Sequence, residues 1–193
     1  MSVRTTGVDP TRLCDRRHSR LLLVDLQERL LAAMPEDERT AVERNTGRLI
    51  EAARLLDVPV EATLQYPRGL GSITAPLEAL LGTGDGRTEK TAFSCCAADD
   101  LVRRLTGADV IVCGTETHVC VLQTTLELLA AGETVFVVAD AVCSRDPRLK
   151  ANGIDRMRAA GGVITNHESV LFEWLRDAAD PQFRAVSRLI LQR

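Results

Sequence analysis

Short apolar runs alternate along the chain with longer stretches in which apolar residues recur every three or four positions. The runs Arg20–Asp25 and Asp109–Gly114 are apolar at nearly every position, which is typical of parallel strands buried on both faces. Further strands are expected at 58–63, 87–90, 133–140 and 162–165. Helical spacing predicts helices at 36–56, 76–81, 99–105, 118–131, 149–160, 167–176 and 180–191, and a loop at 66–71.

This alternation of strands and helices predicts an α/β fold. We expect a three-layer α-β-α architecture, with a mostly parallel, Rossmann-like sheet of about six strands and helices on both faces. No repeat or linker divides the chain, so residues 1–193 are expected to form a single domain, with 1–18 as a loosely ordered lead-in. In such sheets ligands bind beyond the carboxyl ends of the strands, near the point where the strand order switches.

Composition narrows the classes of partner. The 193 residues carry a net charge of -3 and only 3% aromatic residues, so we expect neither nucleic acid nor a membrane as a partner. No apolar run approaches the roughly 20 residues that span a bilayer. Six cysteines without a CxxC pair, together with a polar amino-terminal stretch unlike a signal peptide, predict free thiols and a cytoplasmic location.

Cys120 is the strongest candidate for a reactive group. It follows the strand at 109–114 by a short polar turn and is predicted to lie in the first turn of the next helix. Unpaired backbone N–H groups and the helix dipole favour the thiolate there, and the thiolate is the nucleophilic form. From position alone, a small buried core residue is an equally good interpretation. Cys113, inside the apolar strand, is expected to belong to the core.

Two charged residues also end predicted strands. Asp25 ends the first strand, where its carboxylate could take a proton from a thiol or could cap the next helix. Lys90 ends the third strand, where its ammonium could stabilise a thiolate or could be an ordinary surface charge. If the strand order switches between the first and fourth strands, Asp25 and Cys120 face the same crevice.

Three segments together resemble the isochorismatase-like cysteine hydrolase superfamily: 22–27 (LLVDLQ), 89–94 (EKTAFS) and 114–121 (GTETHVCV). The segments 65–71, 124–128 and 138–145 resemble its branch of isochorismatase domain-containing proteins, and the likeness covers roughly 18–190. The resemblance implies a catalytic triad of Asp25, Lys90 and Cys120. It also implies that Cys120 attacks an amide-like carbon and forms a thioester, so that a C–N bond of a small molecule is hydrolysed.

The resemblance extends to the surroundings of the thiol. It implies a cis peptide bond between Thr115 and Glu116, an oxyanion hole formed by the backbone N–H groups of Glu116 and Cys120, and assembly as a dimer or tetramer. Residues that follow the predicted strands are expected to line the substrate pocket: Gln65, Tyr66, Phe93, Thr117 and His118. For Phe93 a core position, and for His118 an ordinary place at the start of a helix, remain open.

The sequence also departs from one branch of the superfamily. Nicotinamidases hold a metal through an Asp-x-His motif after the second strand, whereas this chain has LQYP at 64–67. We therefore expect no metal and no cofactor. Two alternatives to amide hydrolysis remain open: hydrolysis of a vinyl ether without covalent catalysis, and a non-catalytic interaction protein of the same fold. The adjacent Cys95 and Cys96 could also be redox sensitive.

Overall fold

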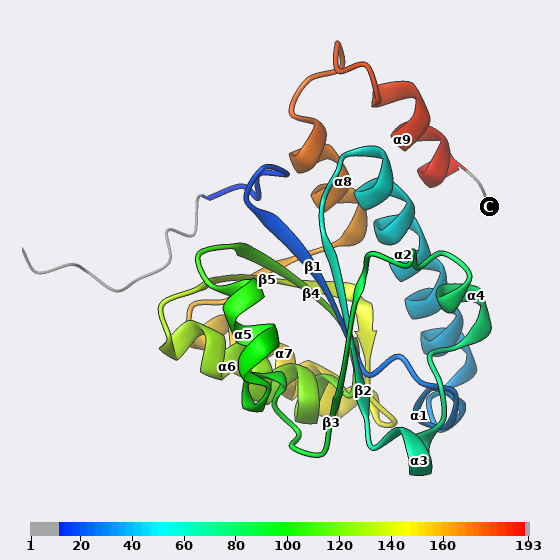
Figure 1. Ribbon diagram of the computed structural model, residues 1–193, viewed down its shortest axis with the longest axis vertical. Coiled ribbons are helices and arrows are strands. Elements are labelled where there is room, and N and C mark those ends of the chain that lie inside the picture. The colour runs from blue at the N-terminus through cyan, green and yellow to red at the C-terminus, as the bar shows by residue number, and fades with distance from the viewer. Residues whose placement is uncertain (1–11, 192–193) are drawn as a thin grey trace, which may run out of the picture.

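The computed structural model describes residues 12–191, which contain one six-stranded sheet (Figure 1). The strands are β1 (Ser19–Val24), β2 (Val60–Gln65), β3 (Gly86–Lys90), β4 (Asp109–Thr115), β5 (Thr134–Cys143) and β6 (Val163–Thr165). Their order is β3-β2-β1-β4-β5-β6, and every neighbouring pair is parallel. The predicted six-stranded, mostly parallel sheet is confirmed.

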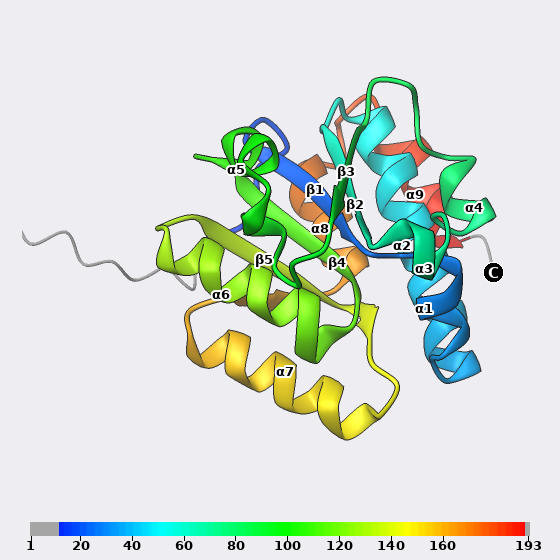
Figure 2. The same ribbon diagram turned by 60° about the horizontal axis from the view of Figure 1, so that its bottom comes forward.

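The alternation of side chains along each strand builds two apolar cores. On β1, Leu21 and Leu23 point into one core and Leu22 and Val24 into the other. The first core is covered by α2 (Glu36–Leu55), α8 (His167–Leu175) and α9 (Phe183–Leu191), and the second by α5 (Asp99–Leu105), α6 (Leu122–Ala130) and α7 (Pro147–Ala159). Figure 2 shows α6 and α7 on one side of the sheet, with α2, α8 and α9 on the other. This is the expected three-layer arrangement.

The remaining elements are short: α1 (Glu28–Ala32), α3 (Pro67–Leu70), α4 (Ala75–Glu78), the 3₁₀ turn η1 (Cys95–Ala97) and the π-helical turn η2 (Thr117–Val121). The periodicity misses α1 because five residues are too few to show a helical period. The predicted loop at 66–71 contains α3, which begins with a proline at its first helical position. Strand β5 runs three residues beyond its predicted end, after a shift in its register against β4.

Part of the predicted loose lead-in is packed. Cys14 is buried, and its backbone N–H donates a hydrogen bond of 2.8 Å to Glu173 on α8. The indole Nε1 of Trp174 donates to the Ser19 hydroxyl at 2.9 Å. Within the lead-in that was expected to be loose, the buried Cys14 and its hydrogen bond to Glu173 attach the described part to α8; residues 1–11 lie outside the described part.

The switch in strand order lies at β1, which pairs with β2 on one side and β4 on the other. Gly114, near the end of β4, brings the two strands unusually close. It has a φ of +132°, and a Cβ placed there would lie 2.0 Å from the carbonyl oxygen of Val24. Only glycine tolerates this combination, so Gly114 lets the segment after β4 approach the residue that follows β1.

Candidate active site

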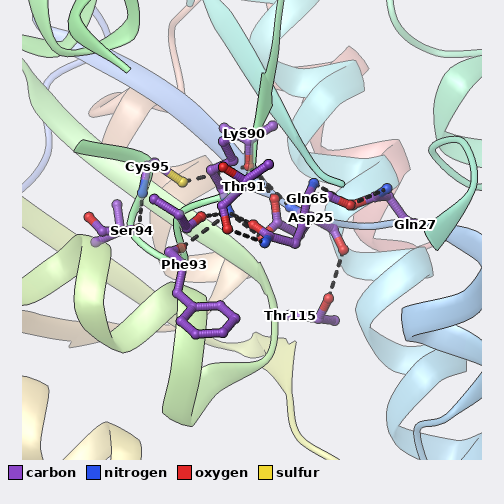
Figure 3. Close-up of polar contacts among 12 residues, drawn as sticks. Asp25, Gln27, Gln65, Lys90, Thr91, Phe93, Ser94, Cys95 and Thr115 are labelled. Carbon is purple, nitrogen blue, oxygen red and sulfur yellow. Dashed lines mark hydrogen bonds and ion pairs between the residues drawn. The ribbon is translucent and has the colours of Figure 1, made fainter. Parts of the chain in front are cut away.

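Asp25 and Lys90 form a buried ion pair at the carboxyl end of the sheet. Asp25 directly follows β1 with a φ of 51°, and Lys90 is the last residue of β3. The Lys90 Nζ lies 2.6 Å from Asp25 Oδ2, and the two side chains are 2% and 0% exposed (Figure 3). Asp25 is not the cap of the next helix, since α1 is preceded by Gln27, and Lys90 is not a surface charge.

Both charged groups have further hydrogen-bond partners. Lys90 Nζ also donates to Gln65 Oε1 at 2.8 Å and to the carbonyl oxygens of Phe93 at 3.1 Å and Ala92 at 3.3 Å. The Thr63 hydroxyl donates to Asp25 Oδ1 at 2.7 Å. A buried ion pair is tolerated only when its remaining hydrogen-bonding capacity is satisfied in this way, so the surroundings fix both groups in one geometry.

Gln65 belongs to this network and is largely buried. Its Nε2 donates to the carbonyl of Thr91 at 2.7 Å, while its Oε1 accepts from Lys90. Gln27, which is not among the predicted site residues, holds Gln65 in place. Gln27 Oε1 accepts from the Gln65 backbone N–H at 2.7 Å, and Gln27 Nε2 donates to the Gly71 carbonyl oxygen at 2.7 Å. The sequence offered one indication of this role: Gln27 lies two residues after Asp25, at the end of a buried strand.

Cys120 lies in η2, between β4 and α6, and remains 5% exposed. Burial raises the pKa of its thiol; the Asp25 charge and a side-chain hydrogen bond with Asp25 raise it further, whereas the Lys90 ammonium lowers it. Desolvation and the neighbouring carboxylate thus act against the thiolate, which the helix terminus was expected to favour.

The position of η2 is fixed from two sides. The Thr115–Glu116 peptide bond is cis, and the Thr115 hydroxyl donates to the backbone carbonyl of Asp25 at 2.7 Å. On the other side, α7 packs closely at Gly153. A Cβ at that position would lie 3.1 Å from the Thr117 carbonyl oxygen. The turn that carries Cys120 is thus held between the end of β1 and α7.

The remaining predicted residues divide into buried and exposed groups. Thr117 is fully buried, and its hydroxyl has no hydrogen-bond partner within residues 12–191. His118 Nδ1 lies 3.0 Å from the Ser144 hydroxyl, and the Glu116 carboxylate accepts from the Arg145 backbone N–H at 3.1 Å. These two contacts join η2 to the segment that follows β5.

Tyr66 and Phe93 are the exposed aromatic residues next to the ion pair, each with 54% of its surface exposed. A core position for Phe93 is therefore excluded. Tyr66 has a φ of 37°, and its ring lies over Gly69. A cavity of about 530 Å³ opens beside Lys90, lined by 66–68, 89–92, 97 and 98. Of the predicted pocket residues, Tyr66 lines this cavity, whereas Gln65, Phe93, Thr117 and His118 do not. The predicted nucleophile Cys120 does not line it either.

Residues 12–191 contain no group of three or more histidine, cysteine or acidic side chains arranged to hold a metal ion. Within the same residues, no helix has both the length and the apolar character needed to cross a membrane.

Comparison with known proteins shows the family of this chain. The model of the isochorismatase domain matches residues 19–169, which is most of the chain. The chain belongs to the isochorismatase family. Mouse isochorismatase domain-containing protein 2A is 38% identical over 177 residues, covering 88% of this chain and 81% of the relative.

Solved structures of isochorismatase-like proteins share the fold. A protein from Caenorhabditis elegans described as MAR1 ribonuclease is 35% identical, with a TM-score of 0.88 over 94% of this chain and 93% of its own. The Escherichia coli YcaC gene product, described as an octameric hydrolase of unknown specificity, is 25% identical, with a TM-score of 0.84 over 95% of this chain and 91% of its own.

Proposed function

We propose that this isochorismatase-family protein is a cysteine hydrolase that cleaves a C–N, amide-like bond of a small molecule. Cys120 is the nucleophile, Asp25 the general base and acid, and Lys90 the electrostatic partner of both. The observation that carries the proposal is the buried Lys90–Asp25 pair, whose two charges act in opposite directions on the pKa of the Cys120 thiol. Buried charged residues that converge at the carboxyl edge of a parallel sheet are typical of catalytic sites.

The first half of the reaction forms a thioester. Asp25 takes the proton of the Cys120 thiol as the sulfur attacks the carbonyl carbon, and Lys90 stabilises the negative charge that moves toward the sulfur. The carbonyl oxygen becomes an oxyanion, held by the backbone N–H groups of Glu116 and Cys120. When the intermediate collapses, the C–N bond breaks and Asp25 returns the proton to the departing amine.

The second half releases the acid. Asp25, again a carboxylate, removes a proton from a water molecule, which attacks the thioester carbon. The C–S bond then breaks, and the Cys120 sulfur takes back the proton from Asp25. A carboxylate that both accepts and returns a proton needs a fixed orientation. The hydrogen bond from Thr63 and the ion pair with Lys90 provide it for Asp25.

Limiting iodoacetamide tests the nucleophile in the native protein, because Cys96 serves as an internal control. Cys96 is partly exposed, while Cys120 is nearly buried. Accessibility alone therefore predicts that Cys96 is labelled first, whereas transfer of the Cys120 proton to Asp25 during the attack predicts that Cys120 is labelled first. Peptide mass mapping reads the order of labelling. Preferential labelling of Cys96, or equal labelling of both, would count against the proposal.

A panel of small primary amides then tests the reaction. Cys120→Ala should abolish turnover. A Cys120→Ala protein that keeps its activity, while Asp25→Ala loses it, would favour hydrolysis of a vinyl ether. Absence of turnover with every amide, together with partner capture unaffected by Cys120→Ala, would favour a non-catalytic interaction protein. The neighbour described as a ribonuclease adds RNA as a substrate to include, although a net charge of -3 favours a small molecule.

We also propose that the protein assembles as a dimer or tetramer. The octameric state given for the Escherichia coli neighbour and the exposed Phe172 and Leu191 on the carboxyl-terminal helices support self-association. Light scattering coupled to size-exclusion chromatography measures the mass directly, and a monomer across the micromolar range would contradict the proposal.

A further inference from the structure

The loop between β3 and η1 supplies the carbonyl groups that hold Lys90. The ammonium donates to the carbonyl oxygens of Ala92 and Phe93. These carbonyls have no strand ladder to fix them, since β3 ends at Lys90. Something outside the loop must therefore hold them in place.

Helix α6 provides this support. The Thr124 hydroxyl accepts a hydrogen bond of 2.9 Å from the backbone N–H of Cys95. One turn further along, the Glu127 carboxylate accepts from the Ser94 hydroxyl at 2.7 Å. Ser94 and Cys95 directly follow Phe93, and both are drawn in Figure 3 with Lys90. Thr124 is completely buried and Ser94 is nearly so, so water offers little replacement for these bonds.

The same helical segment also carries the thiol. Cys120, Thr124 and Glu127 are spaced by four and then three residues, which places them on one side of a helix. Cys120 thus lies at the start of this side of the helix, and the next two turns hydrogen-bond the loop whose carbonyl groups hold Lys90. The Cys120 thiol and the loop that holds the Lys90 ammonium are therefore both attached to the continuous segment of η2 and α6.

We propose that Thr124, assisted by Glu127, is a positioning residue that holds the loop 91–95 against α6 and so fixes the Lys90 ammonium against Asp25, where its charge acts on Cys120. This inference rests on the proposed function. If the loop is released, the carbonyls of Ala92 and Phe93 no longer fix Lys90. The ammonium then stabilises the Cys120 thiolate less, because its charge acts on the sulfur only at short range.

The experiment measures the rate of iodoacetamide alkylation of Cys120 against pH, which needs no substrate. The variants are Thr124→Val, Thr124→Ser, Lys90→Met and a matched control, Thr125→Val. Thr125 is equally buried, and its hydroxyl has no partner within residues 12–191. We expect Thr124→Val to move the midpoint upward by about one pH unit, a roughly tenfold slower rate at fixed pH below the midpoint. Thr124→Ser and Thr125→Val should follow the wild-type profile.

The outcomes separate the two proposals. A Thr124→Val profile that coincides with that of Thr125→Val, while Lys90→Met shifts the midpoint, overturns the positioning role and leaves the triad standing. An unshifted Lys90→Met profile overturns the triad itself. If Thr124→Val does not fold, Ser94→Ala and Glu127→Ala release the loop at its second attachment. An upward shift in both supports the proposal, and wild-type profiles in both refute it.

Discussion

The Lys90 ammonium lies 2.6 Å from the Asp25 carboxylate in a region from which solvent is almost completely excluded. The two residues are 65 positions apart in the sequence and come from the ends of different strands, β3 and β1. Strand β2 separates these two strands in the sheet, so both side chains must reach across its end to meet. The ion pair can therefore form only when β3, β2 and β1 are correctly paired.

Breaking this pair should be costly. Lys90→Met leaves the Asp25 charge buried without its partner, and we expect a loss of about 3–5 kcal/mol in the free energy of unfolding. Urea denaturation followed by circular dichroism measures it. The double variant Asp25→Asn/Lys90→Met should recover part of this loss, since no uncompensated charge remains. A double variant less stable than Lys90→Met alone would contradict this reasoning.

Gly114→Ala should prevent folding or cost more than about 4 kcal/mol of stability, because the added Cβ would lie 2.0 Å from the carbonyl oxygen of Val24. Gly132→Ala is the matched control: its φ is +90°, and nothing lies within 4 Å of the position of a Cβ. There, only the backbone cost of roughly 1–2 kcal/mol is expected. Similar unfolding midpoints for the two variants would show that the close approach of β4 to β1 is not needed.

Gly153→Ala tests the support of η2 by α7. Alanine in a helix interior normally stabilises by about 1 kcal/mol relative to glycine, but here the Cβ would lie 3.1 Å from the Thr117 carbonyl oxygen. We expect no such gain, together with slower alkylation of Cys120 as η2 is displaced. Ala151→Gly, at an exposed site on the same helix, calibrates the ordinary difference. A stabilised Gly153→Ala protein with unchanged alkylation would refute the prediction.

Asp140 should contribute to stability in a pH-dependent way. Burial raises its pKa, but side-chain and backbone hydrogen bonds from His167 outweigh burial and lower it overall. A carboxylate with a depressed pKa stabilises the fold above its unfolded value of about 3.9, and this contribution is lost as the pH falls through the folded pKa. The urea midpoints of wild type and Asp140→Asn should therefore differ at pH 6 and converge below about pH 4. Asp37→Asn, on an exposed part of α2, should show a much smaller difference at pH 6.

Much of the architecture could be predicted from the sequence, because parallel strands that are buried on both faces consist of nearly continuous apolar residues. Asp109–Gly114 was recognisable as a buried strand, and helix 99–105 has its predicted bounds. The residues at strand ends could be grouped for the same reason, since all carboxyl ends of a parallel sheet share one edge. The meeting of Asp25 and Lys90 follows from this rule.

What escaped prediction depends on contacts between distant segments. The ionisation of Cys120 could not be inferred from its place near a helix start, because desolvation and the Asp25 carboxylate act through the tertiary structure. The role of Gln27 as a brace, and the attachment of the 91–95 loop to Thr124, likewise need coordinates. Spacing along the chain indicates which residues share an edge of the sheet, but not which hydrogen bonds they make.

Because all strands are parallel, insertions should be tolerated differently at the carboxyl and at the amino ends of the strands. Asp25, Lys90 and Cys120 follow the carboxyl ends of strands, whereas the open turns at Gly107 and Gly132 precede the amino ends of β4 and β5. Peptide tags, fluorescent reporters or anchoring linkers inserted at these turns would leave the thiol chemistry undisturbed. The protein can thus be immobilised by one edge while small molecules are screened against the other.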